Sequence, residues 1–355
     1  MGLRLGVVGG GTFGLMHLRA YAQLARKGLV ESIALADVDE KCLKKRADQF
    51  PLTTYLDYRE MFTKEDLNGV SVVTPDHLHR EVALSAIEHG FSTLVEKPLD
   101  VTVEGCNKIM EAAEQNEVLC QVDFHKRYDP FHIQLRQAIA DGGLGVPSHG
   151  YAWMEDRIQV PRDWFPHWAP ESSPIWFLGT HMIDLYRWCV GRKNATRVWA
   201  TGQKTKLKDL GIDTYDSIQA HIEFEGGSAL QLSTGWVLPE DFEAVVNQGI
   251  RIYGSEGICK IDSQDRGASL STSQEGHRTI NPVFFLQEDS GANSRVSGYG
   301  VESILSFARN LEFLRDGGYL EELQGTYADA SDGLEVTRIA RGIHRSLDEG
   351  DCIEF

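Results

Sequence analysis

A glycine-rich turn directly after the first apolar segment is the feature that most restricts the fold of this chain. The segment Leu3–Val8 leads into Gly9-x-Gly11-x-x-Gly14, and a helical pattern follows. In such a motif the first glycine permits a tight turn, the second lets the backbone approach a pyrophosphate, and the third allows close helix–strand packing. The phosphates then lie at a helix N-terminus, where free N–H groups and the helix dipole favour negative charge. The motif therefore predicts a dinucleotide-binding unit.

A carboxylate at the end of the second apolar segment indicates which dinucleotide binds. Asp37 follows Gly14 by about 20 residues, the spacing at which an acidic side chain accepts hydrogen bonds from a ribose diol. The same carboxylate repels a 2′-phosphate, and Val38 rather than an arginine comes next. The sequence therefore favours NAD over NADP, and a glycine turn without a ligand is the alternative interpretation.

The first third of the chain alternates short apolar segments with amphipathic helical patterns. Near-continuous apolar strands that alternate with helices are typical of a parallel sheet covered on both faces. The predicted strands are Leu3–Val8, Ser32–Ala36, Gly69–Thr74, Ser92–Glu96 and Glu117–Val122. The expected fold class is α/β, with a doubly wound Rossmann sheet in an NAD-binding domain over residues 1–124.

The pattern changes after about residue 125. From Pro147 onward the apolar segments are longer and alternate with polar residues, and Glu225-Gly226-Gly227 between two of them is a hairpin signal. These segments predict an α+β domain over 125–355 with a large, open, mostly antiparallel sheet.

The remainder of this second domain is expected to hold long polar loops across Ser263–Ser297. Few helices are expected before an amphipathic C-terminal helix at about 331–349. The open face of its sheet is an expected surface for a homodimer or homotetramer.

Charge and cysteine content argue against several classes of protein. The chain has 355 residues and a formal net charge of -17, which argues against a surface for nucleic acid or an anionic membrane. Its six cysteines are scattered without a CxxC pair, as is typical of reduced thiols in a cytosolic protein. No apolar run approaches ~18 residues, and the glycine-rich start does not match a signal peptide. We expect a soluble, cytoplasmic protein.

Two more predicted strands end in polar residues, at the edge where doubly wound sheets bind ligands. The first strand end is Val72–His79, which includes Thr74 and Pro75, and the second is Leu94–Asp100. In the second, Pro98 fixes the backbone after Lys97 and so aims the lysine side chain. A solvated surface lysine is the alternative interpretation.

The glycine motif together with Glu96-Lys97-Pro98 resembles the Gfo/Idh/MocA family of dehydrogenases, named for glucose–fructose oxidoreductase and inositol dehydrogenase. The likeness runs nearly end to end. Further segments that carry it are Thr74-Pro75 with His79, Gln121–Pro130, Gly179–Trp188 and Ser331–Gly350. The resemblance implies hydride transfer between nicotinamide and a secondary alcohol or hemiacetal carbon of a sugar, polyol or cyclitol. It also implies a substrate domain whose open sheet forms dimers or tetramers.

The resemblance also implies roles for individual residues. Lys97 corresponds to the lysine that contacts the reacting hydroxyl and helps to relay its proton, and His181 corresponds to the general acid/base. The expected cofactor-binding residues are Gly9, Gly11, Thr12, Phe13, Gly14, Asp37, Thr74, Pro75, His79, Glu96 and Lys97. The expected substrate-binding residues are Lys97, His125, Arg157, Trp176, Phe177, His181 and Asp184.

Three histidines have alternative interpretations. His181 could be a histidine satisfied by backbone groups at the start of a helix capped by Thr180. His77 and His79 could suggest a metal, but no third ligand lies nearby in the sequence, and we expect no metal site.

One position departs from the family pattern. The motif usually reads Asp-x-Gly-x-His, and Phe177 stands in the place of the aspartate. A phenylalanine can neither bind a substrate hydroxyl nor orient the histidine. Three explanations remain open. Trp176 and Phe177 could stack on the C–H face of a sugar, another polar residue (Asp184, Asp123 or His125) could replace the carboxylate, or the chain could be a cofactor-dependent sensor.

The segment Gln121–Pro130 also departs from the family. Asp123 stands where the family more often has a glycine, and His125 stands where it more often has an asparagine. Two other classes of function are alternatives to a dehydrogenase. One is a regulatory NAD-binding protein, similar to sugar-responsive co-repressors, and the other is an NAD-dependent glycosidase.

Overall fold

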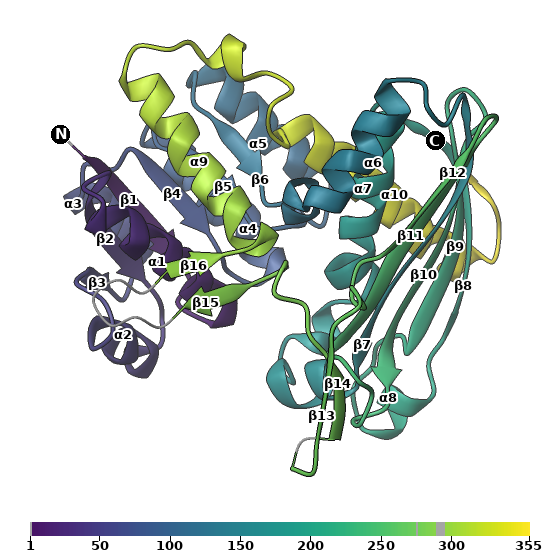
Figure 1. The fold of residues 1–355 in the computed structure, drawn as a ribbon. Helices are drawn as coiled ribbons and strands as arrows, with labels where there is room; N and C mark the ends of the chain where they lie inside the picture. Colours follow the sequence, from purple (N-terminus) through teal and green to yellow (C-terminus); the bar gives the residue numbers. More distant parts are fainter. Residues whose placement is uncertain (1, 275, 289–294) are drawn as a thin grey trace. The chain divides into compact units, whose positions relative to one another are not determined.

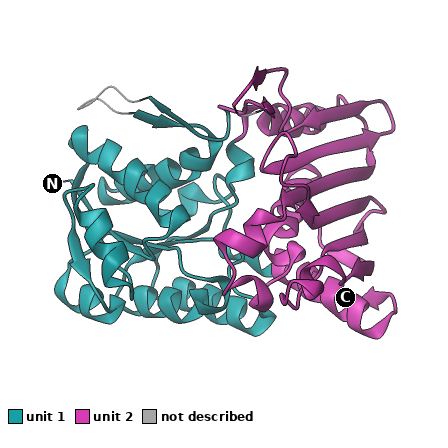
Figure 2. Cartoon of the chain, turned by 90° about the horizontal axis from the view of Figure 1, so that it is seen from below, with its two compact units in different colours: residues 1–128, 283–334 teal, residues 129–282, 335–355 magenta. Residues whose placement is uncertain are grey.

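The computed structural model describes residues 2–274, 276–288 and 295–355. The chain forms two compact units, which Figure 2 colours separately. The first unit comprises Met1–Tyr128 and Val283–Leu334, and the second comprises Asp129–Pro282 and Glu335–Phe355. Among the described residues, no helix has both the length and the apolar character that crossing a membrane requires.

The first unit contains a parallel six-stranded sheet with the order β3-β2-β1-β4-β5-β6 (Figure 1). Its strands are β1 (Leu3–Val8), β2 (Val30–Ala36), β3 (Thr53–Tyr55), β4 (Gly69–Val72), β5 (Ser92–Val95) and β6 (Cys120–Val122). Every residue of β4 and β5 is buried, as expected for strands covered on both faces. The predicted Rossmann sheet is confirmed, although the apolar pattern did not reveal the short and largely exposed edge strand β3.

Helices cover this sheet. They are α1 (Thr12–Arg26), α2 (Glu40–Ala47), α3 (Tyr58–Lys64), α4 (His79–Glu88), α5 (Val103–Gln115) and α9 (Tyr299–Arg315). The strand order of the sheet changes direction between β1 and β4, and doubly wound sheets bind their ligands at such a switch point.

The prediction that residues 125–355 form one continuous second domain needs correction, because 283–334 belongs to the first unit. Helix α9 lies against α1 and β1 (Figure 1). Its buried Ile304 and Phe307 belong to the same apolar core as Leu5 of β1. The expectation of few helices before the C-terminus was also wrong here, although Val301, Ile304, Leu305 and Ala308 follow helical spacing.

The second unit is built on a seven-stranded sheet with the order β12-β11-β7-β10-β9-β8-β17. The pair β7–β10 is parallel and the other pairs are antiparallel, which confirms the mostly antiparallel sheet. The strands are β7 (Pro147–Arg157), β8 (Ala195–Gln203), β9 (Ser217–Phe224), β10 (Ala229–Leu238), β11 (Val246–Gly254), β12 (Ile258–Asp262) and β17 (Ile353–Glu354). The predicted hairpin joins β9 to β10, with Gly226 at φ 82° and Gly227 at φ 85°.

Helices α6 (Pro130–Ala140) and α7 (Thr180–Cys189) lie against one another, and α7 also packs on β7 and β10. All ten residues of α7 are buried. The short helix α8 (Lys206–Asp209) follows β8, and α10 (Ala330–Glu349) confirms the predicted C-terminal helix.

The predicted long loops over Ser263–Ser297 contain two small hairpins instead. These are β13 (Ser269–Thr272) with β14 (Gly276–Thr279), and β15 (Leu286–Glu288) with β16 (Arg295–Ser297). Residues 275 and 289–294 of this stretch lie outside the described residues.

Candidate cofactor and active site

The three glycines of the motif meet different surroundings. Gly9 has φ +102°, and a Cβ there would lie 2.3 Å from the carbonyl oxygen of Val73. A Cβ on Gly14 would lie 2.0 Å from the carbonyl oxygen of Gly9, whereas a Cβ on Gly11 would meet no heavy atom within 4 Å. Gly9 and Gly14 are therefore needed for the turn itself, and Gly11 leaves open space in which a ligand can approach the backbone.

The N-terminus of α1 lies at this open space. Gly11 is its N-cap and provides no side-chain hydrogen bond, and the first turn carries no acidic residue. Thr12 is exposed and Phe13 is half-buried. The first N–H groups of a helix lack intrahelical partners, so this end of α1 can donate hydrogen bonds to phosphate oxygens. The residues present fit the pyrophosphate of a dinucleotide.

Asp37, the residue expected to bind a ribose, also helps to hold the glycine turn. Its Oδ2 accepts a hydrogen bond of 2.6 Å from the backbone N–H of Gly10, and its Oδ1 accepts one of 2.9 Å from the N–H of Asp39. The carboxylate is thereby fixed at the end of β2, where its remaining lone pairs can serve a diol.

Arg46 of α2 is a site residue that the sequence analysis missed. Its Nε donates to the carbonyl oxygen of Gly10 at 2.8 Å, and its Nη2 donates to that of Gly11 at 3.1 Å. The side chain is buried, although it lies in the basic run Lys44–Arg46, which gives no sign that one member turns inward. The guanidinium therefore ties two carbonyl groups of the glycine turn to α2.

His79 connects the ends of two strands. Its Nδ1 lies 2.6 Å from the carbonyl oxygen of Pro98, and its Nε2 lies 2.8 Å from that of Thr74. The imidazole is 1% exposed, whereas Pro75 beside it is exposed. The structure thus gives His79 a positioning role between Thr74 and the Lys97-Pro98 turn.

Lys97 follows β5 and is 8% exposed. Lysine is almost never buried to this extent unless it is paired, so a solvated surface lysine is ruled out. Glu96 before it is equally buried. The predicted ammonium group therefore sits at the carboxyl end of a central strand, on the edge that binds ligands in this sheet class.

Three buried polar side chains of the first unit, those of His17, Glu96 and Asp123, lie together. His17 Nε2 of α1 lies 3.3 Å from Glu96 Oε1 and 3.8 Å from Asp123 Oδ2. Burial lowers the pKa of His17 to about 4 and raises the pKa of Glu96. Burial and the charge of Glu96 raise the pKa of Asp123 to about 8. We call this group the buried carboxyl cluster.

The same three side chains are of types that can bind a metal, and their ligand atoms lie within 4.8 Å of one another. From the sequence, only His77 and His79 suggested a metal. His17, Glu96 and Asp123 are far apart in the chain, so no local pattern links them.

His181 is the second residue of α7 and is 4% exposed. The helix does not begin at an N-cap, because a π-helical turn, η5 (Ile175–Gly179), runs directly into it. Thr180 Oγ1 donates to the carbonyl oxygen of Trp176 at 2.9 Å, so the predicted capping role of Thr180 is wrong. Single π-helical turns are frequent at functional sites.

Trp176 and Phe177 do not form a common platform. Trp176 is 6% exposed and stacks on His344, with ring centroids 5.2 Å apart. Phe177 instead contacts other aromatic rings of the second unit. Its centroid distances are 5.1 Å to Trp168, 5.8 Å to Trp236 and 5.9 Å to Phe165. Neighbouring residues of a helical turn point in different directions, about 100° apart, so Trp176 turns into the core.

The other expected substrate residues fall in both units. In the first unit, His125 stacks on Tyr299 with centroids 5.7 Å apart and lies outside the domain predicted for it. In the second unit, the Arg157 guanidinium donates to the carbonyl oxygen of Phe242, and Asp184 is completely buried within α7. Asp123 faces Glu96, which engages it in the buried carboxyl cluster.

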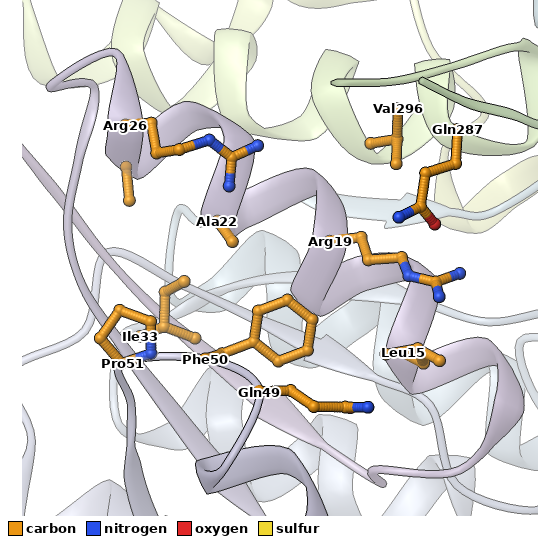
Figure 3. Close-up of a pocket in the computed structure, with 11 residues that line it drawn as sticks. Leu15, Arg19, Ala22, Arg26, Ile33, Gln49, Phe50, Pro51, Gln287 and Val296 are labelled. Atoms are coloured by element: carbon orange, nitrogen blue, oxygen red, sulfur yellow. The ribbon is translucent and has the colours of Figure 1, made fainter. Parts of the chain in front are cut away.

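A separate cavity of about 680 Å³ lies in the first unit and contains none of the predicted site residues (Figure 3). Arg19 and Arg26 of α1 lie on one side of it, and Phe50 and Pro51 lie on another. Its position along α1 and β2 differs from the strand ends that carry Asp37 and Lys97.

Comparison with known proteins agrees with this architecture. Residues 3–124 match the model of an oxidoreductase family with an NAD-binding Rossmann fold (GFO_IDH_MocA), and residues 132–260 match a C-terminal domain of the same family. An inositol 2-dehydrogenase of Rubrobacter xylanophilus is 26% identical over 260 residues, which cover 73% of this chain and 71% of the relative. An inositol 2-dehydrogenase/D-chiro-inositol 3-dehydrogenase of Halalkalibacterium halodurans is 35% identical over 225 residues, 61% of this chain and 62% of the relative.

Among solved structures, the scyllo-inositol dehydrogenase of Lactobacillus casei with bound NAD(H) and scyllo-inositol has a similar fold. Its TM-score is 0.80 at 18% identity, with 100% of this chain and 99% of that chain covered.

Proposed function

The chain belongs to the Gfo/Idh/MocA family of NAD-binding oxidoreductases, which act on CH–OH donors, and we propose that it oxidises a secondary alcohol of a cyclitol or of a related sugar or polyol. The observation that carries this proposal is the burial of Lys97 directly after a central strand whose carboxyl end faces the ligand-binding edge. A buried ammonium group at that edge can hold a reacting oxygen.

The first unit supplies the groups that would hold NAD. The N–H groups at the start of α1 would bind the pyrophosphate beside Gly11, and the Asp37 carboxylate would accept hydrogen bonds from the adenosine ribose. The bound cofactor supplies the acceptor for the hydride.

Lys97 and His181 handle the proton in this proposal. Lys97 donates a hydrogen bond to the reacting hydroxyl oxygen and stabilises negative charge that develops on it. His181 accepts the hydroxyl proton as the general base.

A cyclitol is the favoured substrate class. Several relatives are named inositol dehydrogenases, and Phe177 lies among Trp168, Trp236 and Phe165 in an aromatic cluster. Aromatic rings suit the C–H face of a polyol ring, which supports a stacking role for Phe177 in place of the usual aspartate. A regulatory NAD-binding protein without turnover is the second candidate, and the loss of that aspartate is the observation that favours it.

A homo-oligomer is part of the proposal. Five neighbouring strands of the second sheet each contribute one residue to a row in register. These residues are Arg251, Tyr151, Gln231, His221 and Trp199. Tyr151 and Trp199 are 45% and 49% exposed. A row of side chains that includes two half-exposed aromatic residues suits the contact between copies of the chain.

The test is NADH formation with NAD and a panel of inositols, aldoses, sugar acids and amino sugars. Turnover on a cyclitol supports the proposal, and turnover confined to aldoses assigns a different substrate class. Tight NAD binding without turnover on any member would instead favour the regulatory protein. Release of an aglycone from a glycoside without net NADH would favour a glycosidase.

A further inference from the structure

The buried carboxyl cluster of the first unit has no role in the function proposed above. The backbone brings its members together, because the N–H of Asp123 donates to the carbonyl oxygen of Val95 at 2.8 Å, and Glu96 is the residue after Val95. Asp123 and Glu96 are 1% and 8% exposed, and His17 is 1% exposed. Two carboxyl groups therefore share an interior that water does not reach.

Two ionised carboxylates in such a place repel each other and lose their hydration. A pair of this kind is favoured with one proton and one negative charge, as in other buried carboxyl pairs. The charge is better placed on Glu96, because the Lys97 ammonium lies near it and the backbone N–H of Lys97 binds it. The proton is then left on Asp123, which is hydrogen-bonded to Glu96.

The neighbours of Glu96 can be oriented in one consistent way. Tyr21 Oη lies 2.6 Å from Ser71 Oγ, and Ser71 Oγ lies 3.0 Å from His17 Nδ1. If Tyr21 donates to Ser71 and Ser71 donates to His17, the neutral imidazole carries its proton on Nε2 and donates it to Glu96. Glu96 then accepts from His17 and from Asp123, which suits a carboxylate flanked by a neutral acid.

We propose that Asp123 is a positioning residue that is a neutral carboxylic acid at neutral pH, donates its proton to the Glu96 carboxylate, and so keeps one negative charge rather than two beside Lys97. The consequence for the reaction rests on the role proposed for Lys97. When Asp123 ionises, a second negative charge holds the Lys97 ammonium more strongly and weakens its ability to release or relay a proton.

The groups that face Asp123 come from each element around it. Tyr21 and His17 lie on α1, Glu96 follows β5, and Tyr128 lies in the turn after β6. Burial lowers the pKa of His17 to about 4, and it raises the pKa values of the two tyrosines above their ordinary range. Asp123, with a pKa raised to about 8, changes charge between pH 7 and 9.

The test uses Asp123→Asn and the wild-type chain. An asparagine keeps a donor toward Glu96 but cannot ionise. The infrared difference spectrum between the two proteins, recorded without substrate, should show the C=O stretch of a protonated carboxylic acid at pH 6.5 and its replacement by a carboxylate above about pH 8. A carboxylate already present at pH 6.5 would overturn the proposal.

A second measurement needs no variant. Wild-type protein with ¹³C-labelled aspartate should show one carboxyl resonance that titrates near pH 8, and the absence of such a resonance would also overturn the proposal. Stoichiometric metal in the purified protein, lost in Asp123→Asn, would overturn it as well, because the two carboxylates would then be ligands. Both spectroscopic results stand apart from turnover, so they decide the state of Asp123 even if the dehydrogenase activity fails.

The consequence for Lys97 has its own readout. The pH profile of kcat/KM for the wild type should contain an ionisation near pH 8 that is missing from the Asp123→Asn profile. A variant that keeps this ionisation would overturn the link between Asp123 and Lys97.

Discussion

Arg46 Nε donates a hydrogen bond of 2.8 Å to the carbonyl oxygen of Gly10, so a buried side chain from α2 holds the turn at which the dinucleotide is expected. A second bond reaches the carbonyl of Gly11. The turn's backbone amides can bind phosphate only while its carbonyl groups point elsewhere, and the guanidinium fixes them.

Arg46→Met should therefore weaken NAD binding. Loss of charge-assisted hydrogen bonds of this type costs about 1.5–3 kcal/mol, which corresponds to a Kd about 10- to 100-fold higher. The dissociation constant can be measured from NADH fluorescence. Lys45→Met on the exposed face of the same helix is the matched control, and an unchanged Kd in Arg46→Met would contradict the role of Arg46.

Two alanine substitutions in the glycine motif should affect different properties, one the stability of the fold and the other the affinity for NAD. Gly9→Ala places a Cβ against the carbonyl of Val73 in a left-handed backbone and should lower the free energy of unfolding by more than about 1 kcal/mol. Gly11→Ala meets open space, so it should leave the unfolding free energy nearly unchanged while it raises the Kd for NAD. Equal losses of stability in both variants would show that Gly11 is needed for the fold alone.

The stability of the protein should depend on pH through Asp123. Its pKa is raised from 3.8 to about 8 in the folded chain, so the folded state keeps a proton that the unfolded state has lost, and stability falls as pH rises toward 8. His17, lowered from 6.5 to about 4, acts in the opposite direction below pH 6.5. The contribution of Asp123 between pH 6.5 and 8 is isolated by comparison with Asp123→Asn, which lacks it.

In that window the wild type should lose up to about 2 kcal/mol of unfolding free energy relative to Asp123→Asn. Urea unfolding of both proteins at several pH values measures this difference. Parallel stability curves would contradict the assignment of a neutral Asp123.

Substitutions at Trp176 and Phe177 should have different consequences, the first for stability and the second for substrate binding. Trp176→Ala empties a core position that stacks on His344 and should cost about 3–5 kcal/mol of unfolding free energy. Phe177→Leu keeps an apolar side chain but removes the ring, so it should raise KM for the cyclitol with a smaller loss of stability. An unchanged KM in Phe177→Leu would exclude stacking as the explanation for the missing aspartate.

The fold was largely predictable from the sequence, because strand and helix periodicity is local. The strand Leu3–Val8 and the hairpin at Gly226-Gly227 were both found in this way. The return of α9 to the first unit was not found, because its helical spacing is visible but nothing local tells which core receives Ile304 and Phe307.

The parts of the candidate site that lie in a sequence motif could be predicted. The parts that depend on packing between distant residues could not. The glycine turn and Asp37 were placed correctly relative to one another. The inward turn of Arg46 and the meeting of Asp123 with Glu96 depend on contacts between residues far apart in the chain. The different orientations of Trp176 and Phe177 depend on a π-helical turn that the sequence pattern did not reveal.

The most direct test of the account compares Lys97→Met with Lys108→Met, an exposed lysine of α5, in the NAD-linked oxidation of the best cyclitol. Lys97→Met should lower kcat by about 10²- to 10⁴-fold, the usual range for loss of a positioned proton-transfer group, while the activity of Lys108→Met should stay near that of the wild type. Turnover retained in Lys97→Met would contradict the account.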